Sequence, residues 1–418
     1  MKRVVVTGLG CITPIGNTVA EFREALYAGR TGIAEFDPNF PGAIAGSGLR
    51  FKTSGQVKNF DPVRNEAQRL ASGVIVASDS SAQFGIVAAR HAATESGLVR
   101  HYDPATMAIV TGCSCGGRAA DEDANRHLYT RNARIHPTAI LRAMASSGVS
   151  SIAIELGVTG PVLNISTACA AGTHAIGMAF QMVRSGMASA AIAGGYEAPL
   201  TFGFLRAWDS MRVVSPTSCR PFSADRDGMT LGEGAAMLAL EPLDSALARG
   251  ARIYAEIVGF GMSADAHHIT QPSAEGASLA ITRAVQDAAN AGLNDVVSRI
   301  GYINAHGTGT PTNDAVEAAA IHQALGECGA RVPVGSTKSL TGHSIGAAGA
   351  IEALATILAL DEESLPHTAG VTEADPTLDL DIILGEPREI EAGRDIALSN
   401  SLAFGGLNAV LAFRRFAE

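Results

Sequence analysis

The sequence predicts an α/β protein built from two similar halves. Short apolar runs typical of buried strands alternate along the chain with longer apolar or amphipathic runs typical of helices. A motif of the first half also recurs in the second: residues 166–169 with Gly172 match residues 336–339 with Gly342 at the same offset. Each copy lies between a short apolar run and a long one. We therefore predict a duplicated βαβ-rich unit, with halves at 1–250 and 251–418.

Strands and helices are expected in alternation within each half. In the first half we expect strands at 3–7, 107–111, 162–165, 189–195 and 233–240, and helices at 78–97 and 173–183. In the second half we expect strands at 254–261, 300–304, 333–336, 396–399 and 409–413, and helices at 274–292, 314–325 and 351–360. The segments at 33–61, 210–226 and 338–349 are predicted to be loops or turns, and 121–145 to be polar and then helical. The strand-to-helix turns of the two halves should then face each other.

The composition is that of a well-buried globular protein. The 418 residues are 47% hydrophobic and 17% charged, with a formal net charge of −10. An acidic chain without a basic stripe argues against a nucleic-acid partner. The apolar runs are too short for a membrane span, and the six cysteines are scattered, as in proteins that keep free thiols in the cytoplasm. We therefore predict a cytoplasmic protein without a disulfide framework.

The glycines that follow the first strand do not make a dinucleotide-binding fingerprint. Gly8, Gly10 and Gly16 lie in the expected region, but Pro14 interrupts the motif and the third glycine is displaced. The acidic residue that should end a second strand about 20 residues later is also missing from the sequence. This stretch argues against a nicotinamide-dependent enzyme.

Cys169 lies where a predicted strand meets a predicted buried helix. Ser166 and Thr167 just before it are residue types that cap helix N-termini. Free N–H groups and the positive end of the helix dipole at such a place lower the pKa of a thiol and favour the nucleophilic thiolate. The alternative is a small core residue, since cysteine is often buried for packing alone. Cys169 is therefore a candidate nucleophile.

Two histidines of the second half lie in glycine- and threonine-rich turns after strands. His306 occurs within residues 304–311 and His343 within residues 338–346. If the halves face each other, both imidazoles lie opposite Cys169, which combines a nucleophile with two groups that exchange protons near neutral pH. A zinc site from the same three residues is the alternative. We predict no metal, because a fourth ligand does not stand at a usual spacing.

Further motifs accompany these residues, at 4–10, 167–169, 220–228, 304–310, 338–346 and 400–408. Together they resemble the β-ketoacyl-acyl-carrier-protein synthases, closest to the synthase II branch of bacterial fatty-acid synthesis, over essentially the whole chain. The resemblance implies a thiolase-like fold with a five-layered α-β-α-β-α core. It also implies an acyltransferase that condenses malonyl-acyl-carrier-protein with an acyl group held on Cys169, with loss of CO2, to give 3-ketoacyl-acyl-carrier-protein.

The resemblance also implies a role for each matching residue. Cys169 corresponds to the nucleophile that accepts the acyl group, and His306 and His343 correspond to the pair that promotes decarboxylation. Phe404 corresponds to the gating aromatic residue whose backbone N–H forms an oxyanion hole with that of Cys169. The resemblance implies no cofactor bound by the protein itself, because the substrates carry phosphopantetheine.

Other matching residues are expected to support or line the site. Lys338 matches a lysine beside the two histidines, with Glu352 as its buried acidic partner, and Asp314 is expected to give structural support. The partner implied is an acyl carrier protein. The channel for its pantetheine arm is expected to be lined by three threonines, Thr270, Thr308 and Thr310.

The acyl pocket departs from the family pattern. Cys115 stands where an aliphatic residue is common and Thr138 where an aromatic one is expected, and Phe202 and Phe204 are further candidates for this pocket. Residues 402–403 are Leu-Ala instead of the usual Phe-Gly. Residues 168–172, Ala-Cys-Ala-Ala-Gly, together with residues 198–201, Ala-Pro-Leu-Thr, are more similar to condensing enzymes of nodulation-factor or polyene pathways. A specialised ketosynthase of a type II polyketide, aryl-polyene or nodulation-factor pathway is therefore the alternative function.

Two other members of the same fold are less consistent with the sequence. A degradative thiolase would need a second catalytic cysteine near the C-terminus, but the last cysteine is Cys328. A chain-length-factor-type subunit would lack the nucleophile, whereas Cys169 is present. A homodimer is expected, with a heterodimer that includes a chain-length-factor-like paralogue as the alternative.

Overall fold

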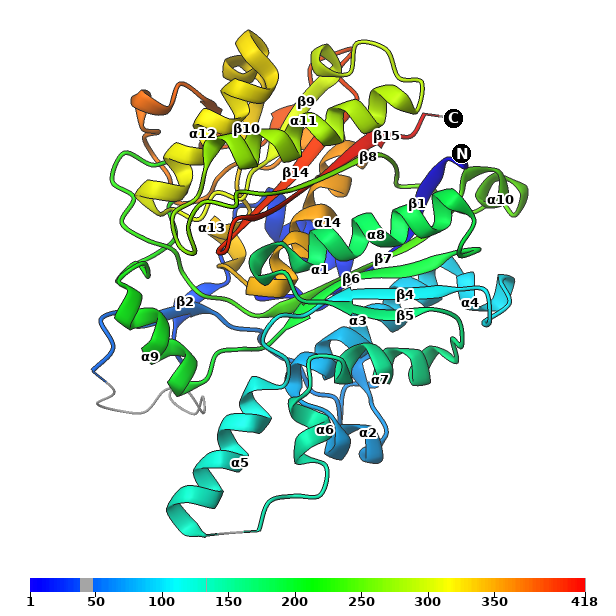
Figure 1. Ribbon diagram of the computed structural model, residues 1–418, viewed down its shortest axis with the longest axis vertical. Helices are drawn as coiled ribbons and strands as arrows, with labels where there is room; N and C mark the ends of the chain where they lie inside the picture. Colours follow the sequence, from blue (N-terminus) through cyan, green and yellow to red (C-terminus); the bar gives the residue numbers. More distant parts are fainter. Residues whose placement is uncertain (38–47, 133, 418) are drawn as a thin grey trace.

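The computed structural model describes residues 1–37, 48–132 and 134–417. Eleven strands of this part of the chain form one continuous sheet (Figure 1). Its order is β12-β10-β9-β14-β15-β8-β1-β7-β6-β4-β5. The strands are β1 Val4–Ile12, β4 Ala108–Gly112, β5 Val162–Ile165, β6 Ala191–Glu197, β7 Gly234–Pro242, β8 Ala255–Ala264, β9 Ile300–Asn304, β10 Pro333–Gly335, β12 Asp381–Ile382, β14 Ile396–Ala403 and β15 Leu407–Arg415.

The strand order repeats, which confirms the predicted duplication. The first half runs β5-β4-β6-β7-β1, and the second half runs β10-β9-β14-β15-β8 in the mirrored direction, with β12 added at the outer edge. The two sets join where residues 4–6 of β1 pair antiparallel with residues 255–257 of β8. Each half therefore contributes a similar five-stranded sheet, and the carboxyl ends of β5 and β10 occupy equivalent places.

The helices form three layers around the two halves of the sheet. α3 and α7 cover the outer face of the first half, α11 and α12 cover the second, and α8 and α14 lie between them (Figure 1). The expected five-layered thiolase-like fold is thus confirmed. The helices are α1 Val19–Tyr27, α2 Ser72–Ala77, α3 Ser80–Ser96, α4 Leu98–His101, α5 Arg118–Arg131, α6 Ala139–Ala143, α7 Ser147–Leu156, α8 Ala171–Ser185, α9 Phe202–Met211, α10 Leu243–Ala248, α11 Ala274–Asn290, α12 Pro311–Leu325, α13 Lys338–Thr341 and α14 Ala348–Asp361.

The middle layer is buried on all sides because its helices are apolar on all sides. Every residue of α14 except Asp361 is buried. Glycines allow the two helices to approach closely: a Cβ atom on Gly172 of α8 would lie 2.8 Å from the backbone nitrogen of Ala350 in α14. This close approach brings the N-terminal ends of α8 and α14 together at the centre of the molecule.

The match of residues 166–172 with residues 336–342 correctly equates the ends of β5 and β10, but it does not align the starts of the two helices that follow. Short 3-10 turns precede both middle helices, η2 Ala168–Ala170 before α8 and η5 Ile345–Ala347 before α14, and each begins with a residue of positive φ, Ala168 at 48° and Ile345 at 49°. Two residues separate β5 from η2, whereas nine separate β10 from η5. Gly346, and not Ser339, is therefore the structural counterpart of Cys169.

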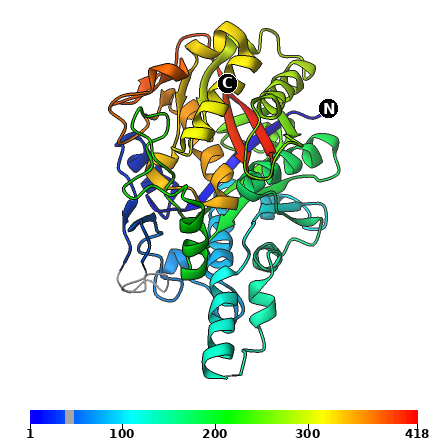
Figure 2. The same cartoon turned by 60° about the vertical axis from the view of Figure 1, so that its left-hand side comes forward.

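Several segments predicted to be loops hold regular structure. The long turn at 338–349 contains α13 and η5, and segment 33–61 contains a short antiparallel pair, β2 Ile33–Glu35 with β3 Thr53–Gly55, while its residues 38–47 lie outside the described chain. A second small pair joins β11 Ser364–Leu365 to β13 Arg388–Glu389. Within 121–145, α5 and α6 make an arm that projects from the body of the molecule (Figure 2).

Two further details differ from the sequence predictions. Loop 210–226 is preceded by α9, which was not predicted. The expected cap at Thr167 also takes another form, since the hydroxyl of Thr167 lies 3.0 Å from Nδ1 of His174, one turn into α8. Among the described residues, none of the helices is long and apolar enough to cross a membrane.

The contact between β4 and α8 predicts a large effect of a single methyl group. A Cβ atom on Gly112, the last residue of β4, would collide with the backbone of Ala171 and Gly172 at the start of α8. Gly112→Ala should lower the free energy of unfolding by about 1–3 kcal/mol, as overpacking does elsewhere. Gly73→Ala in α2 is the control, because a Cβ there meets no heavy atom within 4 Å. Equal urea midpoints for both variants would contradict this account of the packing.

Candidate active site

Cys169 lies in η2, at the carboxyl end of β5 and directly before α8. Its side chain is buried. The backbone N–H of Phe404, in the turn between β14 and β15, faces its sulfur and lowers the pKa of the thiol. The positive φ of Ala168 is sterically costly for a residue with a Cβ and turns the chain sharply at this point. The turn presents the thiol at the interface of the two halves.

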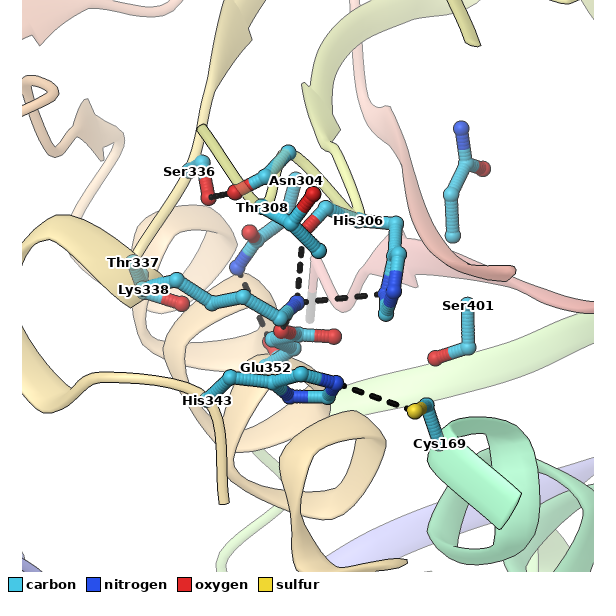
Figure 3. A network of polar contacts seen from close by, with 12 residues as sticks. Cys169, Asn304, His306, Thr308, Ser336, Thr337, Lys338, His343, Glu352 and Ser401 are labelled. Carbon is cyan, nitrogen blue, oxygen red and sulfur yellow. Dashed lines mark hydrogen bonds and ion pairs between the residues drawn. The ribbon is translucent and has the colours of Figure 1, made fainter. Parts of the chain in front are cut away.

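Both predicted histidines meet the thiol from the second half. Nε2 of His343 lies 3.0 Å from the sulfur of Cys169, and the rings of His306 and His343 are perpendicular with centroids 5.3 Å apart (Figure 3). His306 follows β9, and His343 follows α13, within the longer connection after β10. All three side chains are buried. The sulfur and one nitrogen of each ring lie within 4.8 Å of one another.

A buried ion pair holds the histidines in place. The Lys338 ammonium contacts the carboxylate of Glu352 and donates to the backbone carbonyl of His306 at 2.5 Å (Figure 3). It also lies 3.2 Å from Nδ1 of His306. Because an ammonium only donates, Nδ1 acts as the acceptor, so the ring proton of neutral His306 sits on Nε2. The predicted pairing of Lys338 with Glu352 is thus present, and it sets the tautomer of His306.

Two carboxylates of α12 hold the turn that carries His306. Glu317 accepts the N–H groups of His306 and Gly307, each at 2.8 Å. Asp314 accepts those of Thr308 and Gly309 at 3.1 and 3.2 Å. Asp314 therefore stands where structural support was expected. Glu317 was missed, although its spacing of three residues from Asp314 on a predicted helix places both carboxylates on one face.

A cavity of about 300 Å³ opens onto these groups. Its wall includes Cys169, His306, His343 and Phe404. The three threonines expected along the pantetheine channel, Thr270, Thr308 and Thr310, also line it. The cavity thus reaches from the surface to the thiol, and a long, thin acyl carrier arm has the shape to enter it.

Comparison with known proteins agrees with this geometry. Residues 1–246 match the N-terminal domain of the beta-ketoacyl synthases, and residues 254–372 match their C-terminal domain. The chain belongs to the β-ketoacyl synthase family. A Synechocystis protein named 3-oxoacyl-[acyl-carrier-protein] synthase 2 is 41% identical over 99% of this chain and 98% of its own.

Solved ketosynthase structures share the whole fold with this synthase. The ishigamide ketosynthase/chain length factor superposes with a TM-score of 0.90 at 34% identity, and the AntDE:AntF complex, a type II polyketide ketosynthase with its acyl-carrier protein, superposes at 0.86 and 30%. Both comparisons cover 100% of each chain. The likeness therefore extends across both halves of this synthase.

The acyl-pocket residues predicted from the sequence do not line this cavity within the described chain. Cys115 and Phe204 pack behind its wall, in an apolar cluster that also contains the lining residue Met229. Thr138 lies just before α6 on the projecting arm, where its hydroxyl contacts Val76 and His136. Phe202 begins helix α9 and does not line this cavity either. The assignment of these four residues to an acyl pocket stays a prediction.

Glu197 at the end of β6 is a second buried carboxylate that sequence reasoning missed. It accepts the N–H groups of Ser114 at 2.8 Å, Cys115 at 3.0 Å and Gly346 at 3.2 Å, and so joins the turn after β4 to η5. Burial raises the pKa of Glu197 to about 7, against the lowering effect of these hydrogen bonds. The one sequence signal for Glu197 is its position directly after a predicted buried strand.

Burial sets the resting protonation state of the site. It raises the pKa of the Cys169 thiol to about 12, although Lys338 and the N–H of Phe404 oppose the shift. It also lowers the pKa of His306 and His343 well below the usual value, with a further contribution from Lys338. The predicted lowering of the thiol pKa is therefore wrong, because desolvation outweighs the helix terminus. The resting site holds a thiol and two neutral imidazoles.

The Cys–His–His cluster also bears on the zinc alternative. Three ligand atoms lie close enough together for one metal ion. The Lys338 ammonium touches the ring of His306, however, and places positive charge beside any bound cation. Within the described residues, this group contains three candidate ligands and no fourth. This arrangement suits an acid–base and nucleophile site better than a structural zinc site.

The buried ion pair predicts a difference between single and double variants. Lys338→Met leaves the Glu352 carboxylate buried without its cation and should cost about 3–5 kcal/mol of unfolding free energy. Lys338→Met combined with Glu352→Leu removes both charges and should recover most of that loss, as measured by urea denaturation. Condensation activity should stay low in both, because the Nδ1 contact of His306 is gone. A double variant as unstable as the single one would contradict the pairing.

The raised thiol pKa predicts how the free enzyme reacts with an alkylating agent. With a pKa of about 12, the thiolate fraction of Cys169 grows about tenfold for each pH unit. The rate of iodoacetamide alkylation, followed by intact mass, should therefore rise without levelling off between pH 7 and 10. A small-molecule thiol with a pKa of about 8.5 serves as the reference and levels off above that pH. A plateau near neutral pH would reveal a thiolate–imidazolium pair and overturn the assignment.

Proposed function

We propose that this synthase catalyses the decarboxylating Claisen condensation of malonyl-acyl-carrier-protein with an acyl group held on Cys169, in fatty-acid biosynthesis. The supporting observation is the meeting of Cys169, His306 and His343 in one buried cavity, with the N–H of Phe404 on the sulfur. The names of the relatives at 36–41% identity agree with this reaction. The product is a 3-ketoacyl thioester on the carrier protein.

In the first step the acyl group moves to Cys169. Nε2 of neutral His343 takes the thiol proton across 3.0 Å, and the sulfur attacks the thioester carbonyl. The N–H groups of Phe404 and Cys169 stabilise the oxyanion, an effect worth about 3–4 kcal/mol per donor in comparable sites. The carbon–sulfur bond to pantetheine breaks, and the proton passes to the departing thiolate. Proton transfer within the attack explains how a thiol of high pKa serves as nucleophile.

In the second step malonyl thioester loses CO2 and attacks the acyl group. The electron pair of the breaking carbon–carbon bond forms an enolate, whose oxygen accepts a hydrogen bond from the Nε2–H group of His306. His343 donates a second one once its ring proton has moved from Nδ1 to Nε2. Lys338 keeps the ring proton of His306 on Nε2 for this purpose. The enolate carbon attacks the carbonyl of the acyl-Cys169 thioester, and the carbon–sulfur bond to Cys169 breaks. The departing thiolate takes up one proton from the solution, which restores the resting thiol. Neutral imidazoles suit this task, because they donate without losing a proton.

The proposed partner is an acyl carrier protein. A carrier protein is bound to its ketosynthase in the AntDE:AntF structure, which shares the fold of this chain. The type II PKS of that structure and the ishigamide ketosynthase/chain length factor support the alternative of a specialised ketosynthase. Fatty-acid synthesis is favoured, because the curated relatives are named 3-oxoacyl-[acyl-carrier-protein] synthase 2. All six cysteines are free, which fits a reducing cytoplasm.

The proposed oligomer is a homodimer formed across β5. This strand is the outer edge of the first half of the sheet, and edge strands present unpaired backbone groups to a partner. Leu163 in β5 is 48% exposed and Ile154 in the neighbouring α7 is 80% exposed, so apolar surface accompanies the free edge. A heterodimer with a chain-length-factor-like paralogue would use the same edge. The presence of Cys169 disfavours a non-catalytic subunit.

The proposed chemistry predicts that the two steps separate by mutation. Cys169→Ser should lower acyl transfer by a factor on the order of 10³ or more. His306→Ala should instead lower CO2 release from malonyl-acyl-carrier-protein about 10²–10³-fold, the effect of losing one oxyanion donor, while Cys169 still becomes acylated. Intact mass after mixing with acyl carrier proteins, and released CO2, measure the two steps.

Cys328→Ser is the matched control, because Cys328 lies in η4 Gly326–Arg331 outside the catalytic cavity. It should retain both steps. Full acyl transfer in Cys169→Ser, or unchanged CO2 release in His306→Ala, would contradict the proposed roles. The same acylation assay over a series of chain lengths would identify the acyl substrate.

A further inference from the structure

Three aromatic rings form a row that ends at the active-site cavity. Phe204 and Trp208 lie four residues apart on one face of α9, with ring centroids 5.9 Å apart. Trp208 in turn stacks on Phe404, with centroids 5.8 Å apart and ring planes 28° from parallel. Offset stacking at this separation is a favourable aromatic arrangement. The row therefore links α9 directly to the residue whose N–H contacts Cys169.

The backbone that follows Phe404 is held in a tight turn. Gly405 and Gly406 have positive φ, 85° and 70°, which glycine adopts at low steric cost. The N–H of Gly405 donates to the carbonyl of Ile269 at 2.8 Å, and the N–H of Gly406 donates to the carbonyl of Ala403 at 2.9 Å. The Phe404 side chain itself is only partly buried, since it lines the cavity. The stacked indole is thus the ring contact that braces this side chain.

Helix α9 provides a firm base for Trp208. The carboxylate of Glu122, on α5, accepts the N–H of Gly203 at 3.0 and 3.1 Å at the first turn of α9. Asp209 at the other end accepts from the Arg50 guanidinium at 2.9 Å. Leu205 between them is fully buried. The indole is therefore carried by an element that is held at both ends.

We propose that Trp208 is a positioning residue of the condensing reaction, whose indole holds Phe404 so that its backbone N–H stays on the Cys169 sulfur. The inference rests on the proposed function and adds to it a residue that contacts neither thiol nor imidazole. Acyl transfer needs this N–H, because a tetrahedral oxyanion forms. Alkylation by iodoacetamide displaces iodide and forms no oxyanion. A comparison of these two reactions of the Cys169 sulfur therefore distinguishes a misplaced Phe404 N–H from a general disturbance of the site.

The test compares both reactions in Trp208→Ala, Trp208→Phe and wild type at one pH. The free energy of an aromatic pair corresponds to a rate ratio of about 2 to 13. Trp208→Ala should therefore lower kcat/KM for acylation of Cys169 by about 2- to 13-fold. Its alkylation rate should stay equal or rise. Trp208→Phe, which keeps a ring, should recover most of the acylation. Met211→Ala, which removes an exposed side chain of the same helix, is the control and should leave both rates unchanged.

A double-mutant cycle tests whether the effect passes through Phe404. If it does, adding Trp208→Ala to Phe404→Ala should change acylation little further. Trp208 is the only tryptophan in the sequence, so its emission also reports the stack, and Phe404→Ala should shift the emission spectrum. Fully additive effects, or an unshifted spectrum, would overturn the proposal.

The outcomes also distinguish this inference from the proposed function. Equal acylation in wild type and Trp208→Ala would overturn the positioning role while leaving condensation intact. A parallel fall of acylation and alkylation in Trp208→Ala would show a structural effect and likewise overturn it. A wild-type protein that accepts no acyl group from any carrier protein would instead refute the proposed function itself.

Discussion

The buried contact between Lys338 and Glu352 is the interaction on which the rest of the site depends. An ammonium and a carboxylate removed from water are costly unless each has its partner and its remaining hydrogen bonds. Here the ammonium also reaches the carbonyl and Nδ1 of His306. Glu352 stands on α14, in the middle layer, so the ion pair ties the long connection after β10 to a helix in which every residue except Asp361 is buried. The site and the core are thereby joined.

That long connection is where the two halves of the duplication diverge. After β5 the chain passes almost directly into η2 and α8, and this short path leaves Cys169 at the tip of the turn. After β10 the path is longer: it includes α13, which supplies Lys338, and the residues after α13 supply His343. At the structural counterpart of Cys169 stands Gly346, whose N–H is bound by Glu197. One half thus provides the nucleophile, and the other uses its added residues for the groups that surround it.

Burial has opposite consequences for the three central side chains, and the chemistry uses both. It keeps the thiol protonated and the imidazoles neutral, since each group avoids charge in a medium that solvates it poorly. Neutral imidazoles retain their N–H donors, and the thiol gives up its proton only as the sulfur attacks. The carboxylates that hold the surrounding turns face the same penalty, and they meet it with backbone N–H groups instead of cations. The three reacting side chains are therefore neutral, within a framework of charged groups held by the ion pair and by backbone N–H groups.

The sequence by itself determined the duplicated α/β organisation, the meeting of Cys169 with His306 and His343, and the pairing of Lys338 with Glu352. The first two follow from local rules: apolar runs mark strands and buried helices, and residues that follow equivalent strands converge. The pairing of Lys338 with Glu352 was implied by the resemblance to the condensing enzymes. Only the tertiary structure decided the pKa of the thiol, the places of Thr138 and Phe202 outside the cavity, the stack of Trp208 on Phe404, and the turn-holding roles of Glu197 and Glu317. Desolvation, cavity walls and ring contacts depend on which segments, far apart in the sequence, pack together. The spacing of residues along the chain does not show which segments those are.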